Sequence, residues 1–350
     1  MSQEDGERPP DRIVGLSIDD AADVLVAADE TRDRDAVGRA LSYVVEDGVV
    51  TENGVDEALS HLSKVVSTPE TRAELAAIEL ADAREAAVPV ADLDTVQARL
   101  DAFEERLDAV ESRVAELGAE LQTLVAADDP SDAEERYERA VGIQQLTRGA
   151  NDTQRAADEL QVDVEEFQRW LADPERRYDE IGEGLDALDE SLTDLAGVVD
   201  DVAAGSDGGT AAGSSDGTDA EEDDGARRDG ETDPAAAWAD AALRHRAVGL
   251  LFPDLRAELA DLRTMDEGNG VDADVRDRAA EVDARLDDLR ERWRAIGDRL
   301  DDGARPAWRE RYSDRVAGFE EAIDTVEPPI DWGAVQAELD EHRAALGDSE

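Results

Sequence analysis

The clearest pattern in the chain is an unbroken seven-residue repeat of apolar positions between residues 93 and 124. One apolar residue opens each heptad and another follows three positions later, which is the a/d pattern of a coiled-coil helix. The repeat predicts such a helix over residues 91–127, with a seam of about 48 Å at about 1.5 Å per residue. The seam residues are Leu93, Val96, Leu100, Phe103, Leu107, Val110, Val114, Leu117, Leu121 and Leu124.

Charged residues flank this seam and bear on the partner of the helix. Arg99 and Arg106 occupy g positions, and Glu104 and Glu111 occupy the e positions that follow them. In a parallel homodimer each of these arginines would face a glutamate across the seam. An antiparallel helix of the same chain satisfies the apolar pattern equally, so both pairings stay open at this point.

Helical spacing continues before the coiled coil and indicates an all-α chain. Apolar residues recur at spacings of three and four, while strand-type alternation is almost absent. Residues 13–90 predict a domain of four short helices, with start signals at Ser17, Asp33, Thr51 and Thr68 with Pro69. The predicted inward residues are Leu25, Leu41, Val45, Leu59, Leu62, Val66, Leu75, Ile78 and Leu80.

After the coiled coil, residues 131–202 predict a further helical module. Ser131 and Glu134 have the spacing of a capping box, so we expect a helix from there to about Leu146, followed by more helices up to Val202. Residues 203–234 contain Gly, Ser, Thr and acidic residues without a large apolar side chain, which is typical of a disordered linker. The polar tail, residues 1–12, is also predicted to be disordered.

The C-terminal part, residues 235–350, carries a second heptad and four of the five tryptophans. Its apolar positions are Val275, Ala279, Val282, Leu286, Leu289, Trp293, Ile296 and Leu300. Proline and glycine interrupt the helical pattern on both sides of this heptad, which predicts a helical bundle. The expected fold is therefore all-α and elongated, with coiled-coil helices, small bundles and an acidic linker that divides the chain in two.

The net charge of the chain indicates the salt environment in which such a fold is stable. The chain has 350 residues, with 36 Lys and Arg against 92 Asp and Glu, for a net charge of −56, and only one basic residue, Lys64, is a lysine. Such a charge repels itself unless salt screens it, and the Debye length falls from about 8 Å at 0.15 M to about 3 Å at 1 M. The composition resembles that of proteins from halophilic archaea, and its field repels nucleic acid and anionic lipid.

The pattern of one segment indicates a specific biochemical function. Residues 153–171, TQRAADELQVDVEEFQRWL, resemble the helix-turn-helix of repressor-type DNA-binding proteins. The resemblance implies a turn at residues 161–163 and DNA contacts from Gln154, Gln168 and Arg169. Gln161 stands where the family has a glycine, and residues 131–171 hold ten acids against five arginines. A packing or dimerisation module is therefore favoured over a DNA contact.

Patterns for catalysis or cofactor binding are absent from the sequence. The chain has no cysteine, and His61, His245 and His342 lie in separate regions without metal-ligand spacing. There is no phosphate-binding glycine loop, and with 92 acidic residues a pair of carboxylates occurs by chance anywhere. We predict no catalytic residue, no cofactor and no metal, and the lack of a signal peptide or long apolar run predicts a cytoplasmic protein without a membrane contact.

A second resemblance covers most of the chain. Residues 250–265, LLFPDLRAELADLRTM, joined to long acidic coiled coils, resemble haloarchaeal proteins labelled "halo transducer protein". That label implies signal transduction. The sequence thus predicts a non-enzymatic scaffold or regulatory protein that acts through helix–helix contacts, as a homodimer or with an unknown protein partner. The alternative is a DNA-binding transcription regulator that uses residues 153–171.

Overall fold

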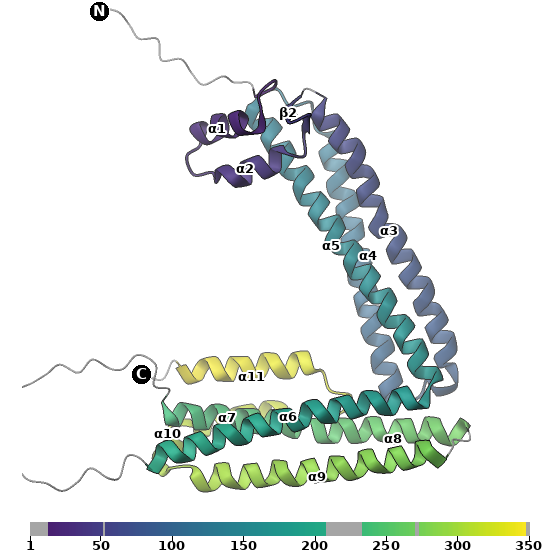
Figure 1. The fold of residues 1–350 in the computed structure, drawn as a ribbon, viewed down its shortest axis with the longest axis vertical. Coiled ribbons are helices and arrows are strands. Elements are labelled where there is room, and N and C mark those ends of the chain that lie inside the picture. The colour runs from purple at the N-terminus through teal and green to yellow at the C-terminus, as the bar shows by residue number, and fades with distance from the viewer. Residues whose placement is uncertain (1–12, 52, 208–232, 270–272, 348–350) are drawn as a thin grey trace, which may run out of the picture. The chain divides into compact units, whose positions relative to one another are not determined.

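The computed structural model describes residues 13–51, 53–207, 233–269 and 273–347, and these residues divide into two compact units. The first unit comprises residues up to 89 together with 99–168, and the second comprises residues 90–98 and those from 169 onwards. The all-α prediction is confirmed (Figure 1). The expected disorder of the 1–12 tail and of most of the 203–234 linker lies outside the described residues.

The first unit begins with two short helices and a β-hairpin. Helix α1, Ile18–Ala28, and helix α2, Arg34–Leu41, have Ser17 and Asp33 as N-caps, as predicted. Strands β1, Val45–Glu46, and β2, Val49–Val50, pair antiparallel through a turn whose two residues, Asp47 and Gly48, both have positive φ. This hairpin was not predicted, although an Asp-Gly pair between apolar residues is a signal for such a turn.

Helix α3, Gly54–Ala87, is one helix where the sequence predicted two, and it leads into the short η1, Val88–Val90. The predicted start at Thr68 and Pro69 is wrong, because the buried stripe of Val66, Ala73 and Leu80 keeps the same phase on both sides of the proline. The Thr68 hydroxyl donates to the Lys64 carbonyl one turn earlier. Tertiary packing along a continuous stripe outweighs the loss of one backbone hydrogen bond at a proline.

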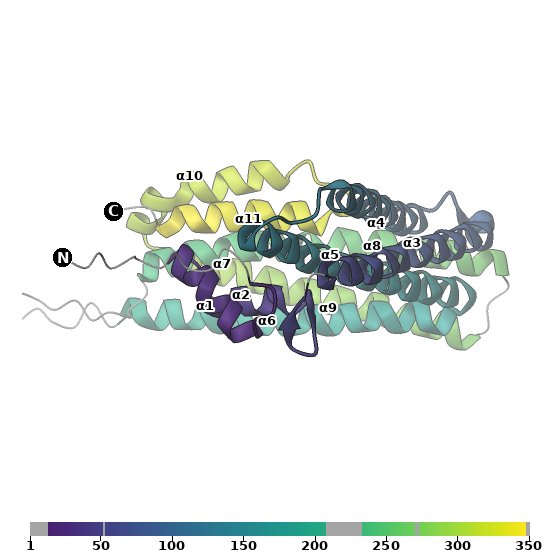
Figure 2. The ribbon, with the colours of Figure 1, turned by 90° about the horizontal axis from the view of Figure 1, so that it is seen from above.

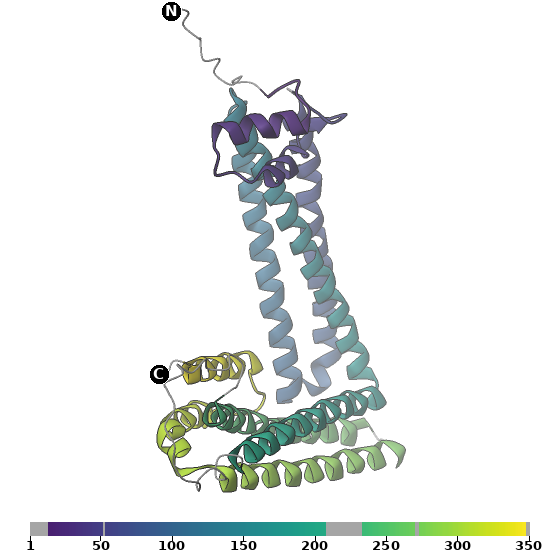
Figure 3. The same ribbon diagram turned by 60° about the vertical axis from the view of Figure 1, so that its left-hand side comes forward.

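Helix α4, Asp94–Ala126, and helix α5, Ala133–Ala172, complete the first unit as a bundle with α3 (Figures 1 and 3). Their shared core includes Ala73, Val110 and Ala157, one residue from each helix. Ion pairs cross the helix boundaries from Arg84 to Glu104, from Arg106 to Asp163 at 2.8 Å and from Arg72 to Asp158 at 3.3 Å. The pairings run α4 antiparallel to both α3 and α5.

Helix α5 differs from its prediction in two respects. It begins one residue after Asp132, whose Oδ1 accepts from the Glu135 backbone N–H, and Ser131 donates to Glu135 instead of pairing with Glu134. It then continues to Ala172 without a break, where several helices were expected. The cause is again a continuous apolar stripe, which includes Ala150, Ala157, Val164 and Phe167.

In its described residues, the second unit contains six further helices. They are α6, Pro174–Asp207; α7, Pro234–Gly249; α8, Leu251–Asn269; α9, Ala273–Gly303; α10, Pro306–Ile323; and α11, Trp332–Gly347. Helices α6 and α9 pack along each other, and α7 contacts both of them (Figure 3). Helices α10 and α11 lie side by side and cover α7 (Figure 2). The C-terminal bundle therefore includes a helix from before residues 208–232.

A ladder of ion pairs fixes the register of α6 against α9. Arginines at seven-residue spacing on α9 meet aspartates on α6, and both series rise together, so the two helices are parallel. The pairs are Arg278 with Asp179, Arg285 with Asp186, Arg292 with Asp189 and Arg299 with Asp200. Between the helices, the apolar stripes of Leu185 to Val202 and of Val282 to Leu300 are buried.

The domain boundaries in the structure differ from those predicted from the sequence. The predicted division at residues 203–234 does not separate two units, because α6 packs with α7, α8 and α9. Helix α6 also extends to Asp207, five residues into the predicted linker, since alanines at 203 and 204 favour helix. No helix within the described ranges is long and apolar enough to cross a membrane.

Candidate functional site

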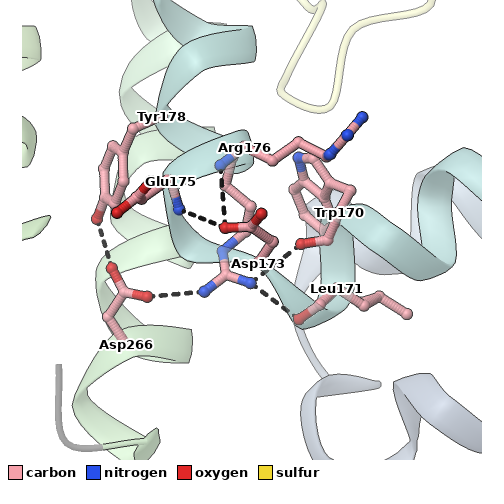
Figure 4. A network of polar contacts seen from close by, with 8 residues as sticks. Trp170, Leu171, Asp173, Glu175, Arg176, Tyr178 and Asp266 are labelled. Carbon is pink, nitrogen blue, oxygen red and sulfur yellow. Dashed lines mark hydrogen bonds and ion pairs between the residues drawn. The ribbon is translucent and has the colours of Figure 1, made fainter.

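The most deeply buried charges in the second unit form one network of side chains (Figure 4). The Arg177 side chain is 1% exposed, and its guanidinium donates through Nη2 to Asp266 Oδ1 at 2.9 Å. Tyr178 Oη donates to the other carboxylate oxygen, Oδ2, at 2.7 Å. Arg177 Nη1 also donates to the carbonyls of Trp170 at 3.1 Å and Leu171 at 2.9 Å. The network therefore joins the end of α5, the start of α6 and α8.

Local sequence explains how the network is assembled. Helix α5 ends at Ala172, and Asp173 caps the next helix by accepting from the backbone N–H of Glu175 at 3.0 Å. Pro174 then opens α6, where a missing N–H has no cost. Arg177 lies in the first turn of α6, close enough to reach the carbonyls that α5 leaves unpaired at its C-terminus. Its guanidinium thus caps one helix from the beginning of the next.

Burial and hydrogen bonding determine the charge states in the network. Removal from water raises the pKa of the Tyr178 phenol, and its hydrogen bond to Asp266 raises that pKa further, so the phenol stays protonated and remains a donor. Each oxygen of Asp266 receives one strong donor. Both oxygens of Asp266 and both terminal nitrogens of Arg177 have partners, whereas the buried Arg177 Nε has none among the described residues. These paired contacts make the network a lock between helices.

A cavity of about 400 Å³ borders this lock. Arg263, Glu267, Arg276 and Ala279 line it together with Tyr178 and Asp266. Arg263 is held by Asp283 at 3.2 Å and by the Ala279 carbonyl. Among the residues that the structure describes, no group of three His, Cys, Asp or Glu side chains could hold a metal ion.

The predicted coiled-coil seam faces the interior of the chain. Val96, Val110 and Leu117 are buried, and Leu93, Leu100, Phe103, Leu107, Val114, Leu121 and Leu124 are half-buried. Leu117, Leu121 and Leu124 pack in a cluster with residues of α3 and α5. The Phe103 ring contacts the Phe167 ring of α5, with centroids 5.6 Å apart. Of the two pairings that the sequence left open, the antiparallel intramolecular one occupies this seam.

The three predicted DNA-contacting residues lie on one uninterrupted helix. The turn expected at residues 161–163 is wrong, because α5 runs through it with Leu160 and Val164 buried in a continuous stripe. Gln168 is half-buried and donates to the Glu79 carbonyl of α3 at 3.1 Å. Gln154, also half-buried, reaches Asp158 at 3.5 Å, and Arg169 is exposed and has a partner of its own. The crossing of two helices that a helix-turn-helix requires is absent from residues 153–171.

Neither the network nor the ladder was predicted from the sequence. Arg177 and Asp266 are 89 residues apart, and nothing in their local pattern sets them apart from the other charges. The ladder did carry a signal, since arginines at 278, 285, 292 and 299 follow the heptad of α9. Repeats of one charge beside an apolar seam indicate a helical partner with the opposite charge.

Comparison with known proteins gives no match, whether to a protein family, to a curated protein or to a solved structure. The function therefore rests on the geometry of the chain itself.

Proposed function

We propose that this protein is a non-enzymatic scaffold or regulatory protein that acts through helix–helix contacts and assembles as a homodimer. The observation that carries the proposal is an outer cluster of large apolar side chains on the first unit. Leu75 and Ile78 on α3 are 40% and 58% exposed, and Val162 on α5 is 53% exposed. Leu75 and Ile78 were predicted to point inward, and that prediction is wrong because the buried stripe of α3 runs through Ala73, Ala76 and Leu80.

Contacts between α3 and α5 place Leu75 and Val162 at one level of the bundle, with Ile78 close to them. Arg72 pairs with Asp158, and Gln168 bonds to the Glu79 carbonyl, which fixes the register of the two parallel helices. Leu75 follows Arg72 by three positions and Val162 follows Asp158 by four, so both lie one turn further along. Ile78 is one turn beyond Leu75 on the outer surface of α3. We call Leu75, Ile78 and Val162 the α3–α5 apolar cluster.

A second copy of the chain is the proposed partner for this cluster. The seam of α4 is already packed against α3 and α5, so an intermolecular contact has to use an outer surface. A two-fold dimer would place the same cluster on both sides of the interface. Complete burial of a Leu, Ile or Val side chain contributes about 1.5–3 kcal/mol, whereas the surrounding acidic surface repels polyanionic partners such as DNA. Molar salt, which we propose as the working environment, screens the repulsion between two chains of charge −56.

Light scattering tests this assembly. In about 2 M KCl, where charges are well screened, the wild-type protein should show twice the 37.8 kDa mass of the chain. Replacing all three cluster residues by Gln should give a monomer with unchanged helicity. The matched control is Val125→Gln, because Val125 is 54% exposed on α4 and lies outside the cluster, and this variant should remain dimeric. A wild-type monomer at micromolar concentration, or a triple variant that stays dimeric, would contradict the proposal.

A further inference from the structure

A cleft of about 400 Å³ lies within the second unit, where α7, α9 and α10 meet. Two indoles and an imidazole line it, those of Trp238, Trp293 and His245. Small residues on the facing helices, Ala242, Gly297, Ser313 and Ala317, leave the space open. A volume of this size is within the range of small-molecule sites.

The aromatic side of the cleft is rigidly built. The His245 and Trp293 rings stack with centroids 4.7 Å apart and planes 4° from parallel. The His245 Nε2–H donates to the Trp293 carbonyl, and Trp293 Nε1 donates to the His245 carbonyl, both at 2.9 Å. A Cβ at Gly297 would lie 2.8 Å from the imidazole, and one at Gly249 would lie 2.8 Å from the indole, so both glycines are required for the stack.

Hydrogen-bond donors on this side are already in use. Trp238 Nε1 donates to the Leu300 carbonyl at 3.1 Å, in addition to the two reciprocal bonds of the stack. Burial lowers the pKa of His245, so its ring is neutral near pH 7. These aromatic groups therefore offer a ligand polarisable ring surface and no positive charge.

The charged groups of the cleft are unequally engaged. Arg246 pairs with Glu320 at 3.1 Å and also donates to the Ala242 carbonyl. Arg309 donates to the backbone carbonyl of Asp301. The Asp301 carboxylate forms no hydrogen bond or ion pair with any residue in the described ranges. Beside the aromatic rings, the cleft thus presents a carboxylate that interacts electrostatically with the His245 ring and has no described hydrogen-bond partner.

We propose that this cleft binds a small organic monocation, of the quaternary ammonium class, between the aromatic rings and the carboxylate of Asp301. Aromatic faces attract such cations, and an alkylated ammonium loses less hydration than a metal ion when it enters an apolar space. The net charge of −56 concentrates cations at the surface of the protein. An anionic ligand is disfavoured for two reasons. The two guanidinium groups of the cleft already have partners, and the negative net charge of the chain repels anions.

Titration with choline tests the proposal on the full chain. Choline chloride replaces KCl at constant total chloride while tryptophan fluorescence is recorded, and we expect a saturable change. The neutral carbon isostere 3,3-dimethylbutan-1-ol should bind about tenfold more weakly, because it lacks the charge. Asp301→Asn should weaken choline binding about fivefold, while Asp302→Asn, next to it and outside the cleft lining, should not.

Two results would overturn the proposal. One is a linear fluorescence response of the wild-type protein without saturation. The other is equal binding of choline and its neutral isostere, which would show an apolar site without a cation preference. Gly297→Ala supplies an independent perturbation, because its methyl group displaces the imidazole and should weaken choline binding even where Asp301 is intact. The light-scattering mass reports the proposed dimer separately, so the two ideas can fail independently.

Discussion

Arg177 offers the sharpest test of how the second unit is held together. Replacing it by Met keeps most of the side-chain volume and removes the guanidinium that Asp266 and two carbonyls share. Asp266 would then remain buried without its charged partner, since its side chain is only 9% exposed. Breaking a buried ion pair in this way costs about 3–5 kcal/mol. That loss is a large fraction of the total stability of about 5–15 kcal/mol that is typical of folded domains.

Urea unfolding followed by tryptophan fluorescence measures this loss where it occurs. The five tryptophans, Trp170, Trp238, Trp293, Trp308 and Trp332, all belong to the second unit, so the signal reports that unit. Urea is uncharged and leaves the salt concentration unchanged. Tyr178→Phe is the graded control, because it removes one hydrogen bond to a charged group and should cost about 1.5–3 kcal/mol.

A double variant separates the loss of a pair from the loss of volume. Arg177→Met with Asp266→Leu replaces both charges by apolar groups, and it should be more stable than Arg177→Met alone. If Arg177→Met changes the unfolding free energy by less than about 1 kcal/mol, the network does not hold α5, α6 and α8 together. The same conclusion follows if the double variant is the less stable of the two.

Three further predictions concern charge and pH. The raised pKa of Tyr178 means that the folded state favours the protonated phenol, so stability should fall as pH rises above about 10, and Tyr178→Phe should reduce that fall in urea titrations. The lowered pKa of His245 means that the folded state favours the neutral ring, so stability should fall as pH drops below about 6.5. His245→Gln should flatten this loss, and His61→Gln, at an exposed site, should leave it unchanged. In the ladder, Arg292→Gln should lower the free energy of unfolding by at most about 1 kcal/mol at low salt, and by less in molar KCl. The control is Arg294→Gln on the same helix. Arg294 has no described ion pair, so this variant should leave the free energy of unfolding almost unchanged in the same assay.

The periodic pattern predicted helices well and their partners poorly, for a physical reason. A heptad shows which face of a helix is apolar, but it does not show which other helix covers that face. The seam of residues 93–124 therefore located α4, while its cover by α3 and α5 required the fold. Pro69 illustrates the same limit, because a local breaker was outweighed by a stripe that packs on both sides of it.

Nothing of the buried network could be predicted from sequence. Arg177 and Asp266 are two charges among many, and only folding brings them to 2.9 Å. For the glutamines expected to contact DNA, a local pattern did give a prediction, and the fold places them differently. Gln168 was assigned by analogy to an exposed recognition helix, and the structure turns its amide towards the α3 backbone.

Because α6 packs in parallel with α9, the fold of the second unit does not depend on an intact peptide chain between them. Helix α6 ends at Asp207, and it packs against α7, α8 and α9, which all follow Asp233. The interface that joins these parts contains the apolar stripes and all four ladder pairs. A peptide bond cut between 207 and 233 would therefore leave two fragments that stay associated. The two halves could be expressed as separate polypeptides and would reassemble on mixing, each completing the other's core.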